Sequence, residues 1–233
     1  MRILGFDTAT RATAVAIWDT GGEVEFEGRD DPAPGERPHH ATRLLPLIAE
    51  QLERAGVGWE ELDRMAVGVG PGTFTGLRIG LATARALARA RALPLIGVST
   101  LESLALGAAS GSDSDAVLAV IDARRGEVFA AAFTPSLDPL LEPSALRPEA
   151  LADRVAGLGK SVLAVGDGAI EFRAVLERSG AQVPEDRAAI HRVSAINHCR
   201  LASGKPESLP DQILPDYLRL PDAEIARRTD RQK

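Results

Sequence analysis

The residues whose types and positions could do chemistry form two acidic turns and a glycine pair. Asp7 and Thr8 end the first strand-like run, Asp122 ends a later one, and Gly166 and Gly168 follow. Such parts can cradle a nucleotide, because carboxylates hold its cation and glycines let a phosphate approach the backbone. Both acidic turns lack the glycine that this approach needs. The sequence therefore predicts remnants of nucleotide turns and no working cofactor site in this chain.

The histidines and the single cysteine do not have the spacing of a metal or nucleophile site. On a helix, His39 and His40 would point about 100° apart, and His191 and His198 would stand roughly 10 Å apart along the axis. We expect the histidines to be surface or loop-packing residues. Cys199 follows His198 directly, and adjacent helical residues do not face each other, so we expect a buried, inert thiol. We predict no catalytic residue and no resident metal.

The most informative stretch is glycine-rich and lies between a strand-like run and a helical pattern. It lacks the Lys-Ser/Thr ending of a P-loop, and threonines occupy the places where a dinucleotide fingerprint needs a third glycine. The helix start could hold an anion. The interpretation that we favour is a tight turn whose glycines supply positive φ and whose Thr75 caps the helix. The residues assigned to this turn are Gly70, Pro71, Gly72, Thr73, Thr75 and Gly76.

Composition excludes several classes of protein. The chain has 233 residues, of which 45% are apolar and 26% charged, so wholesale disorder is excluded. The net charge of −6 and an aromatic content of 4% argue against a stand-alone nucleic-acid binder. One cysteine excludes an internal disulfide framework and suits a reducing compartment. With no apolar run of membrane length and no export signal, we expect a cytoplasmic protein.

The order of predicted elements indicates an α/β fold in two parts. A strand that ends in Asp, a turn and a second strand occur twice, at Asp7 and at Asp122. We read 110–115 as a polar linker between two domains, 1–109 and 116–233. Residues 214–220 are a candidate for packing back on the first domain. Two tandem ribonuclease-H-like, actin-like units are expected, the second degenerate. The predicted strands are 2–6, 12–18, 23–28, 65–69, 95–98, 116–121, 127–133 and 162–165, and the predicted helices are 41–55, 76–91, 101–109, 148–156, 169–179 and 193–202.

The predicted helix 76–91 carries more apolar surface than packing on one sheet requires, whereas the predicted helix 41–55 has one clear apolar stripe. In the helix 76–91, Arg78, Arg85 and Arg89 fall within about 20° of one line and small or apolar residues cover most of the rest. This helix is either well buried in a layered domain or also packs on a partner, and the arginine line is either a solvated face or a contact with acidic groups of that partner. The candidate interface residues are Leu44, Leu45, Ile48, Leu52, Gly76, Ile79, Gly80, Ala82, Thr83 and Ala86.

Five segments together resemble one family. The stretches 3–10, 70–80, 97–101, 122–128 and 215–219 look like those of the TsaB family, in the same order along the chain. The resemblance implies a duplicated actin-like fold and a cytoplasmic subunit without its own cofactor. It implies a complex with the catalytic paralogue TsaD and the ATPase TsaE, which uses ATP to place a threonylcarbamoyl group on the tRNA adenosine beside the anticodon.

The resemblance also implies how the subunit makes contact. In the family the two helices just described bind the paralogue, or a second copy in isolation, and tRNA is reached only through the complex. The "glycoprotease-like" label of such families does not imply protease activity here. The alternative function is a stand-alone ATP-dependent enzyme of the actin-like kinase fold that transfers a phospho or carbamoyl group, and it would turn over ATP by itself.

Overall fold

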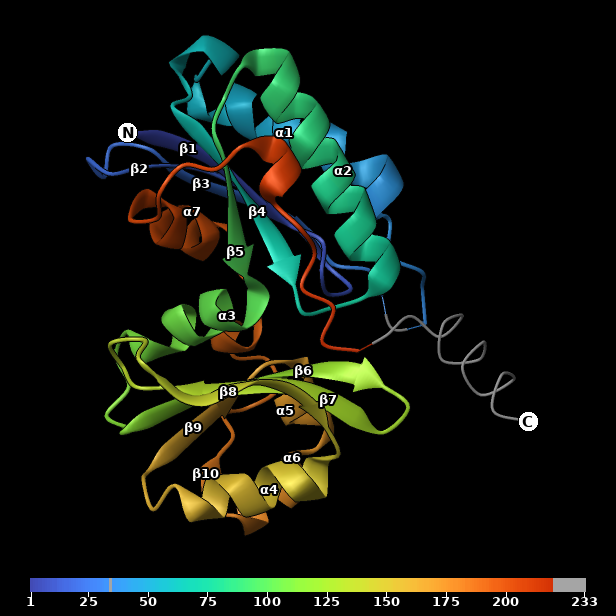
Figure 1. Ribbon diagram of the computed structural model, residues 1–233, viewed down its shortest axis with the longest axis vertical. Coiled ribbons are helices and arrows are strands. Elements are labelled where there is room, and N and C mark those ends of the chain that lie inside the picture. The colour runs from blue at the N-terminus through green and yellow to red at the C-terminus, as the bar shows by residue number, and fades with distance from the viewer. Residues whose placement is uncertain (34, 220–233) are drawn as a thin grey trace.

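The computed structural model describes residues 1–33 and 35–219, and these form two lobes, each built on a five-stranded mixed sheet (Figure 1). The first sheet has the order β3-β2-β1-β4-β5. Its first three strands are antiparallel neighbours, whereas β4 and β5 run parallel to β1. The strands are β1 (Arg2–Asp7), β2 (Thr13–Asp19), β3 (Glu25–Asp30), β4 (Arg64–Gly70) and β5 (Leu95–Ser99).

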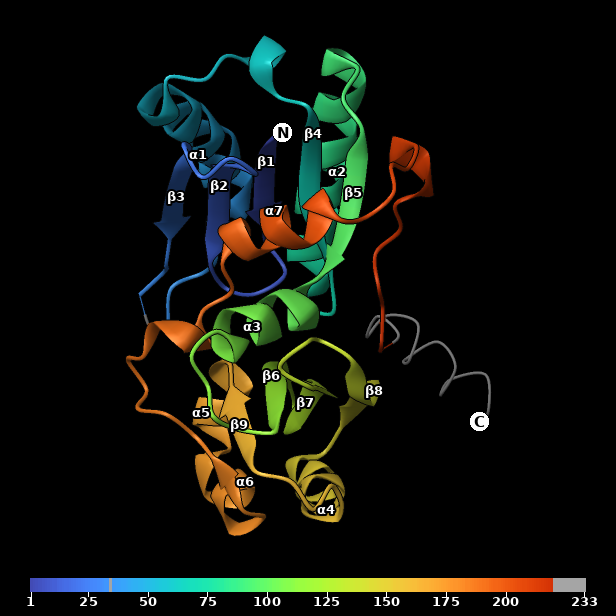
Figure 2. The same ribbon diagram turned by 90° about the vertical axis from the view of Figure 1, so that its left-hand side faces the viewer.

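Helices cover both faces of the first sheet, which explains why β1 and β2 are apolar on both sides. One face carries α1 (His40–Ala55) and α2 (Phe74–Arg91), and the short η1 (Trp59–Glu61) leads into β4. The opposite face carries α7 (Ala195–Ser203), as the two views show (Figures 1 and 2). α2 connects the neighbouring parallel strands β4 and β5, because the end of one parallel strand and the start of the next lie at opposite ends of the sheet.

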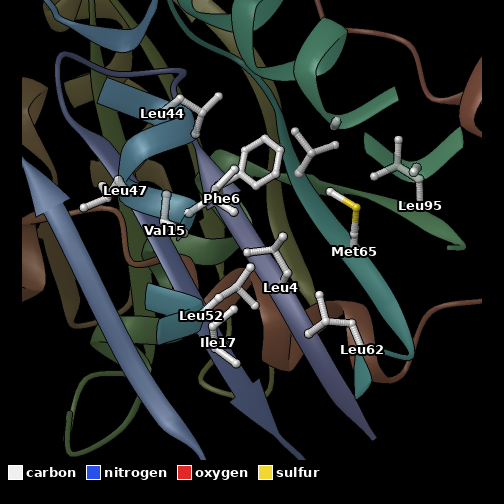
Figure 3. Close-up of a cluster of buried hydrophobic side chains, with 14 of the residues drawn as sticks. Leu4, Phe6, Val15, Ile17, Leu44, Leu47, Leu52, Leu62, Met65 and Leu95 are labelled. Atoms are coloured by element: carbon white, nitrogen blue, oxygen red, sulfur yellow. The ribbon is translucent and has the colours of Figure 1, made fainter. Parts of the chain in front are cut away.

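The main core of this lobe lies between the sheet and the α1–α2 layer. Leu44 and Leu47 of α1 lie over Phe6 and Val15 of the sheet (Figure 3). Residues three apart, such as these two leucines, lie on one face of a helix, so a single stripe of α1 supplies this contact. Pro46 lies inside α1 on its exposed side.

The second sheet has the order β10-β9-β6-β7-β8, so β6 to β10 take the places that β1 to β5 have in the first. One face packs on α4 (Pro148–Gly157), α5 (Asp167–Glu171) and α6 (Arg173–Arg178), and the other on α3 (Thr100–Ala109). The strands are β6 (Ala116–Arg124), β7 (Glu127–Phe133), β8 (Pro139–Leu146), β9 (Val162–Val165) and β10 (Ala181–Gln182).

The chain crosses between the lobes twice, and this corrects the predicted boundary. It leaves the first lobe through α3 and returns after η2 (Ala189–His191) into α7, which packs on the first sheet. A final segment with η3 (Pro210–Gln212) then runs along β5. The predicted second domain, 116–233, is therefore wrong from residue 195 to 213, because these residues pack on the first lobe. Residues 216 and 217 of the candidate segment also lie on the first lobe, whereas Leu218 and Arg219 contact the second. The prediction for Leu220 lies outside the described residues.

Further elements differ from the sequence prediction, among them the two-residue strand β10, which is not in it. β8 was not predicted, because Pro139 and Pro143 interrupt its pattern, and proline is tolerated only in an edge strand such as this one. The predicted helix 169–179 is two short helices that break at Phe172. Within the described parts of the chain, no helix combines the length and apolar character needed to cross a membrane.

Candidate functional site

The glycine-rich turn joins the first acidic turn to α2. A Cβ on Gly72 would overlap the carbonyl of Ala9, and a Cβ on Gly76 would overlap the carbonyl of Thr8. The N–H of Thr73 donates to the Ala9 carbonyl at 2.7 Å. The missing side chains thus let the start of α2 lie directly on the turn that follows β1.

This geometry changes the expected role of the glycines. Gly70 has a φ of 107°, but Gly72 and Gly76 do not have positive φ, so close approach is what requires them. The predicted helix cap is wrong as well. α2 starts at Phe74, and Thr75 is an exposed residue inside it.

Asp7, at the end of β1, is 1% exposed and is bound by its own chain. Its Oδ2 accepts a hydrogen bond from the Thr100 hydroxyl at 2.9 Å and lies 3.0 Å from Nε2 of His198. Its Oδ1 accepts from the N–H of Ala9 at 2.7 Å. Burial works to raise the pKa of Asp7, but the hydrogen bond and charge of His198 and the other donors outweigh it and lower the pKa. Asp7 is therefore an ionised carboxylate whose partners are buried protein groups.

Sequence reasoning missed these partners. Ser103 Oγ lies 2.9 Å from Nδ1 of His198, whose Nε2 reaches Asp7, so Ser, His and Asp lie in the order of a nucleophilic triad. Ser103 and His198 are both 0% exposed, and the Ser103 hydroxyl donates to the carbonyl of Ser194 at 3.1 Å. A serine that no substrate can reach and whose proton is held by a carbonyl is not a nucleophile. Nothing in the sequence pattern links these distant positions.

The expectation that the histidines are surface or loop-packing residues is wrong for His40 and His198, which are buried at the start of α1 and inside α7. Burial lowers the pKa of His40, whose Nδ1 lies 2.9 Å from the Thr13 hydroxyl. His191 does pack against a loop, because its Nδ1 accepts from the N–H of Gly166 at 3.1 Å. Residues 1–33 and 35–219 contain no group of three side chains that could hold a metal ion.

The carboxylate of the second acidic turn, Asp122, is also paired with groups of its own chain. The backbone N–H of Arg124 donates to Asp122 at 2.8 Å, and its guanidinium lies 3.0 Å from the same carboxylate. The N–H of Asp122 in turn donates to Asp167 at 3.0 Å. Burial raises the pKa of Asp167, and the negative charge of Asp122 adds to this effect. Asp122 and Arg124 thus form a pair that stabilises the turn.

The glycine pair near Asp167 serves helix packing. Gly166 has a φ of 112°, and a Cβ there would overlap the carbonyl of Val120. A Cβ on Gly168 would lie 2.9 Å from the carbonyl carbon of Ile121. The cavity between the lobes beside Asp167 measures about 220 Å³, below the roughly 300–1,000 Å³ of ligand pockets.

A larger cavity of about 430 Å³ opens where α2 begins, beside the β6–β7 hairpin. Its lining includes Phe74, Tyr217, Arg124 and Arg219. Arg124 pairs with Asp122, as described, and Arg219 lies 2.9 Å from the carboxylate of Glu127. The lining therefore combines aromatic rings with arginines that are matched by acidic groups of the same chain.

Only some of the candidate interface residues lie on the outer surface of α1 and α2. Leu45 is 54% exposed, Ala82 and Ala86 are exposed, and Ile79 and Thr83 are half-buried. Of these side chains, only Ile79 packs against the hydrophobic core of the lobe.

The rest of the predicted interface is wrong, because those residues are buried in the lobe itself. Leu44, Ile48 and Leu52 point from α1 into the core and are at most 6% exposed. Gly76 and Gly80 lie against the turn after β1, where a Cβ on either would meet Thr8. The apolar stripe of α1 thus satisfies its own sheet.

The arginine line of α2 holds the end of the described chain. We call residues 205–219 the strap. Arg78 donates to the Tyr217 hydroxyl at 3.3 Å, Arg85 donates to a strap carbonyl at Ile213, and Arg89 pairs with Asp211. These three side chains contact groups of the same molecule, although Arg78 and Arg89 are exposed and only Arg85 is half-buried.

Comparison with known proteins identifies the family of this chain. The family model for TsaD, described as tRNA N6-adenosine threonylcarbamoyltransferase, matches residues 36–226. The tRNA threonylcarbamoyladenosine biosynthesis protein TsaB of Escherichia coli K12 is 38% identical over 173 residues, which is 72% of this chain and 72% of that protein. The chain belongs to the TsaB family.

Solved structures agree with this TsaB assignment. YeaZ from Pseudomonas aeruginosa is similar with a TM-score of 0.77 and 29% sequence identity, over 93% of this chain and 99% of that one. The ethanolamine utilization protein EutJ from Carboxydothermus hydrogenoformans has a TM-score of 0.52 at 14% identity, over 85% of this chain and 90% of that one. The second likeness concerns the fold alone. The family resemblance of the five sequence segments is confirmed.

Proposed function

We propose that this TsaB-family chain is a non-catalytic subunit in the synthesis of threonylcarbamoyladenosine in tRNA and works by binding a TsaD-type catalytic paralogue. The observation that carries the proposal is the state of Asp7. The carboxylate at the first acidic turn is bound by His198 and Thr100 of the same chain, so it is not presented to a nucleotide. The names of its relatives supply the pathway.

The exposed strip of α1 and α2 supports a role in protein contact. Leu45, Ala82 and Ala86 are exposed on the same side of the first sheet, and Ile79 and Thr83 are half-buried beside them. We propose that this strip binds the TsaD-type paralogue, or a second copy when the chain is alone. The ATPase TsaE, ATP and tRNA then belong to the assembled cytoplasmic complex.

Both sheets have the same strand order, which bears on the origin of the two lobes. We propose that the lobes are tandem copies of one ribonuclease-H-like unit and that the second is degenerate, since its outer strand β10 has two residues. The alternative of a stand-alone ATP-dependent transferase is less well supported, because Asp122 is bound within its own turn and the glycine pair packs on β6.

Reconstitution tests the proposal. The chain is purified with TsaD and TsaE from one organism, and tRNA modification is assayed with each protein omitted in turn, alongside ATP turnover by each protein alone. We expect modification to require all three and this chain alone to show no ATP turnover above a blank. Turnover by the isolated chain with a small acceptor, or full modification without it, would reject the proposal.

A further inference from the structure

Two helices contribute to the contact between the lobes, and each packs on a different sheet. Leu101 and Leu104 of α3 belong to a core with the second sheet, whereas Ala195 and Ala202 of α7 belong to a core with the first. α3 and α7 lie against each other where the two lobes meet (Figures 1 and 2). A movement of one lobe against the other must therefore change the contact of α3 with α7.

The buried polar cluster around Asp7 lies at this contact. Asp7 at the end of β1 and His198 of α7 belong to the first lobe, whereas Thr100 and Ser103 come from α3. Asp7 accepts from the Thr100 hydroxyl, and the His198 ring lies between Asp7 and Ser103. All four side chains are at most 1% exposed. The cluster thus ties both crossing helices to the central strand of the first sheet.

The ring of His198 is held at both of its nitrogens. Nδ1 lies 3.0 Å from the carbonyl oxygen of Ser194 and 2.9 Å from the Ser103 hydroxyl, and Nε2 lies 3.0 Å from the Asp7 carboxylate. Buried polar groups in contact are costly to separate, because no water replaces the lost partner.

The neighbouring strand leaves room for this pair. A Cβ on Gly68 of β4 would overlap the Asp7 carboxylate and would lie 3.1 Å from Nε2 of His198. Glycine in a strand interior weakens the strand, so its presence here has a local cause. That cause is the space taken by the ion pair.

We infer that the His198–Asp7 pair, through its contacts with Thr100 and Ser103 of α3, locks the two lobes in one arrangement. Asp7 accepts from the Thr100 hydroxyl and His198 contacts Ser103, so α3 cannot shift against α7 while these contacts are intact. The first acidic turn binds internal side chains, and the result is a fixed arrangement of the molecule. This inference does not depend on the proposed partner.

Distances between the lobes test the lock. Spin labels are placed at exposed Glu50 of α1 and Glu149 of α4, in a Cys199→Ala background, and their distance distribution is measured with and without magnesium ATP. We expect one narrow distribution that ATP does not change. His198→Gln and Asp7→Asn should each widen it at least twofold or add a second population. Folded variants that keep the narrow distribution would overturn the lock.

The background variant is also the matched control. Cys199 is buried in the same helix as His198, but its thiol faces the Ile3 carbonyl and is outside the cluster. Cys199→Ala alone should therefore keep the narrow distribution, and widening by it would show that any defect in α7 frees the lobes, which would overturn the assignment to the pair. If His198→Gln and Asp7→Asn do not fold, Thr100→Val and Ser103→Ala each remove one hydrogen bond. At least one of these should widen the distribution, and two unchanged distributions would reject the inference.

Discussion

At the scale of single residues, the ionised state of Asp7 makes stability depend on acid pH. Its pKa in the folded protein lies below the ordinary 3.8. Stabilisation is therefore complete above the unfolded pKa and is lost as the pH falls through the folded one. Near neutral pH, Asp7→Asn should lower the free energy of unfolding by about 3–5 kcal/mol, because it leaves His198 unpaired.

Urea unfolding of both proteins at several pH values measures this difference. We expect it to be constant from neutral pH down to about pH 5 and to shrink below about pH 4. Asp153→Asn on the exposed side of α4 serves as the control and should show no such trend. A difference between wild type and Asp7→Asn that persists unchanged to about pH 2 would mean that Asp7 is not the group that titrates.

Two helical glycines offer a second residue-scale comparison. A Cβ on Gly76 would overlap the Thr8 carbonyl, whereas a Cβ on Gly157 at the end of α4 would meet nothing within 4 Å. Gly76→Ala should therefore destabilise the protein by about 1–3 kcal/mol through overpacking, despite alanine's higher helix propensity. Gly157→Ala should be neutral or stabilise by up to about 1 kcal/mol. Thermal unfolding checks both, and equal effects would contradict the close-packing role of Gly76.

At the scale of elements, the exposed strip of α2 can be separated from its buried face. Ala86→Glu places a charge on the strip, where the free chain has room for it. We expect a folded protein whose affinity for the paralogue falls by at least about tenfold, because an unpaired charge at an apolar interface costs several kcal/mol. Calorimetric binding measures this, with Ala150→Glu on exposed α4 as the control. Unchanged binding would place the interface elsewhere.

The strap gives a second prediction at this scale. Arg85 is half-buried and donates to the Ile213 carbonyl, whereas Arg89 and Asp211 are more than 60% exposed. Arg85→Ala should lower the free energy of unfolding by about 1.5–3 kcal/mol, and Arg89→Ala by less than about 1 kcal/mol. Urea unfolding of both variants tests this ranking. The reverse ranking would mean that the strap is held by its exposed contacts.

At the scale of the whole molecule, local patterns and long-range contacts were not equally predictable. The strands Arg2–Asp7 and Glu127–Phe133 are apolar runs bounded by turns, so their positions follow from the sequence. The return of α7 to the first lobe has no local signal, because its pattern fits any half-buried helix. For the same reason the sequence indicated Asp7 as a site residue but not its partners Thr100 and His198.

The strap also has a consequence for how the molecule behaves in a concentrated solution. β5 is the outermost strand of the first sheet, and the strap meets it through a bridge between Leu95 and Ser208. An uncovered strand edge is a template on which strands of other molecules can add and aggregate. By holding the strap beside this edge, the arginines of α2 leave less of it free to pair with strands of other molecules.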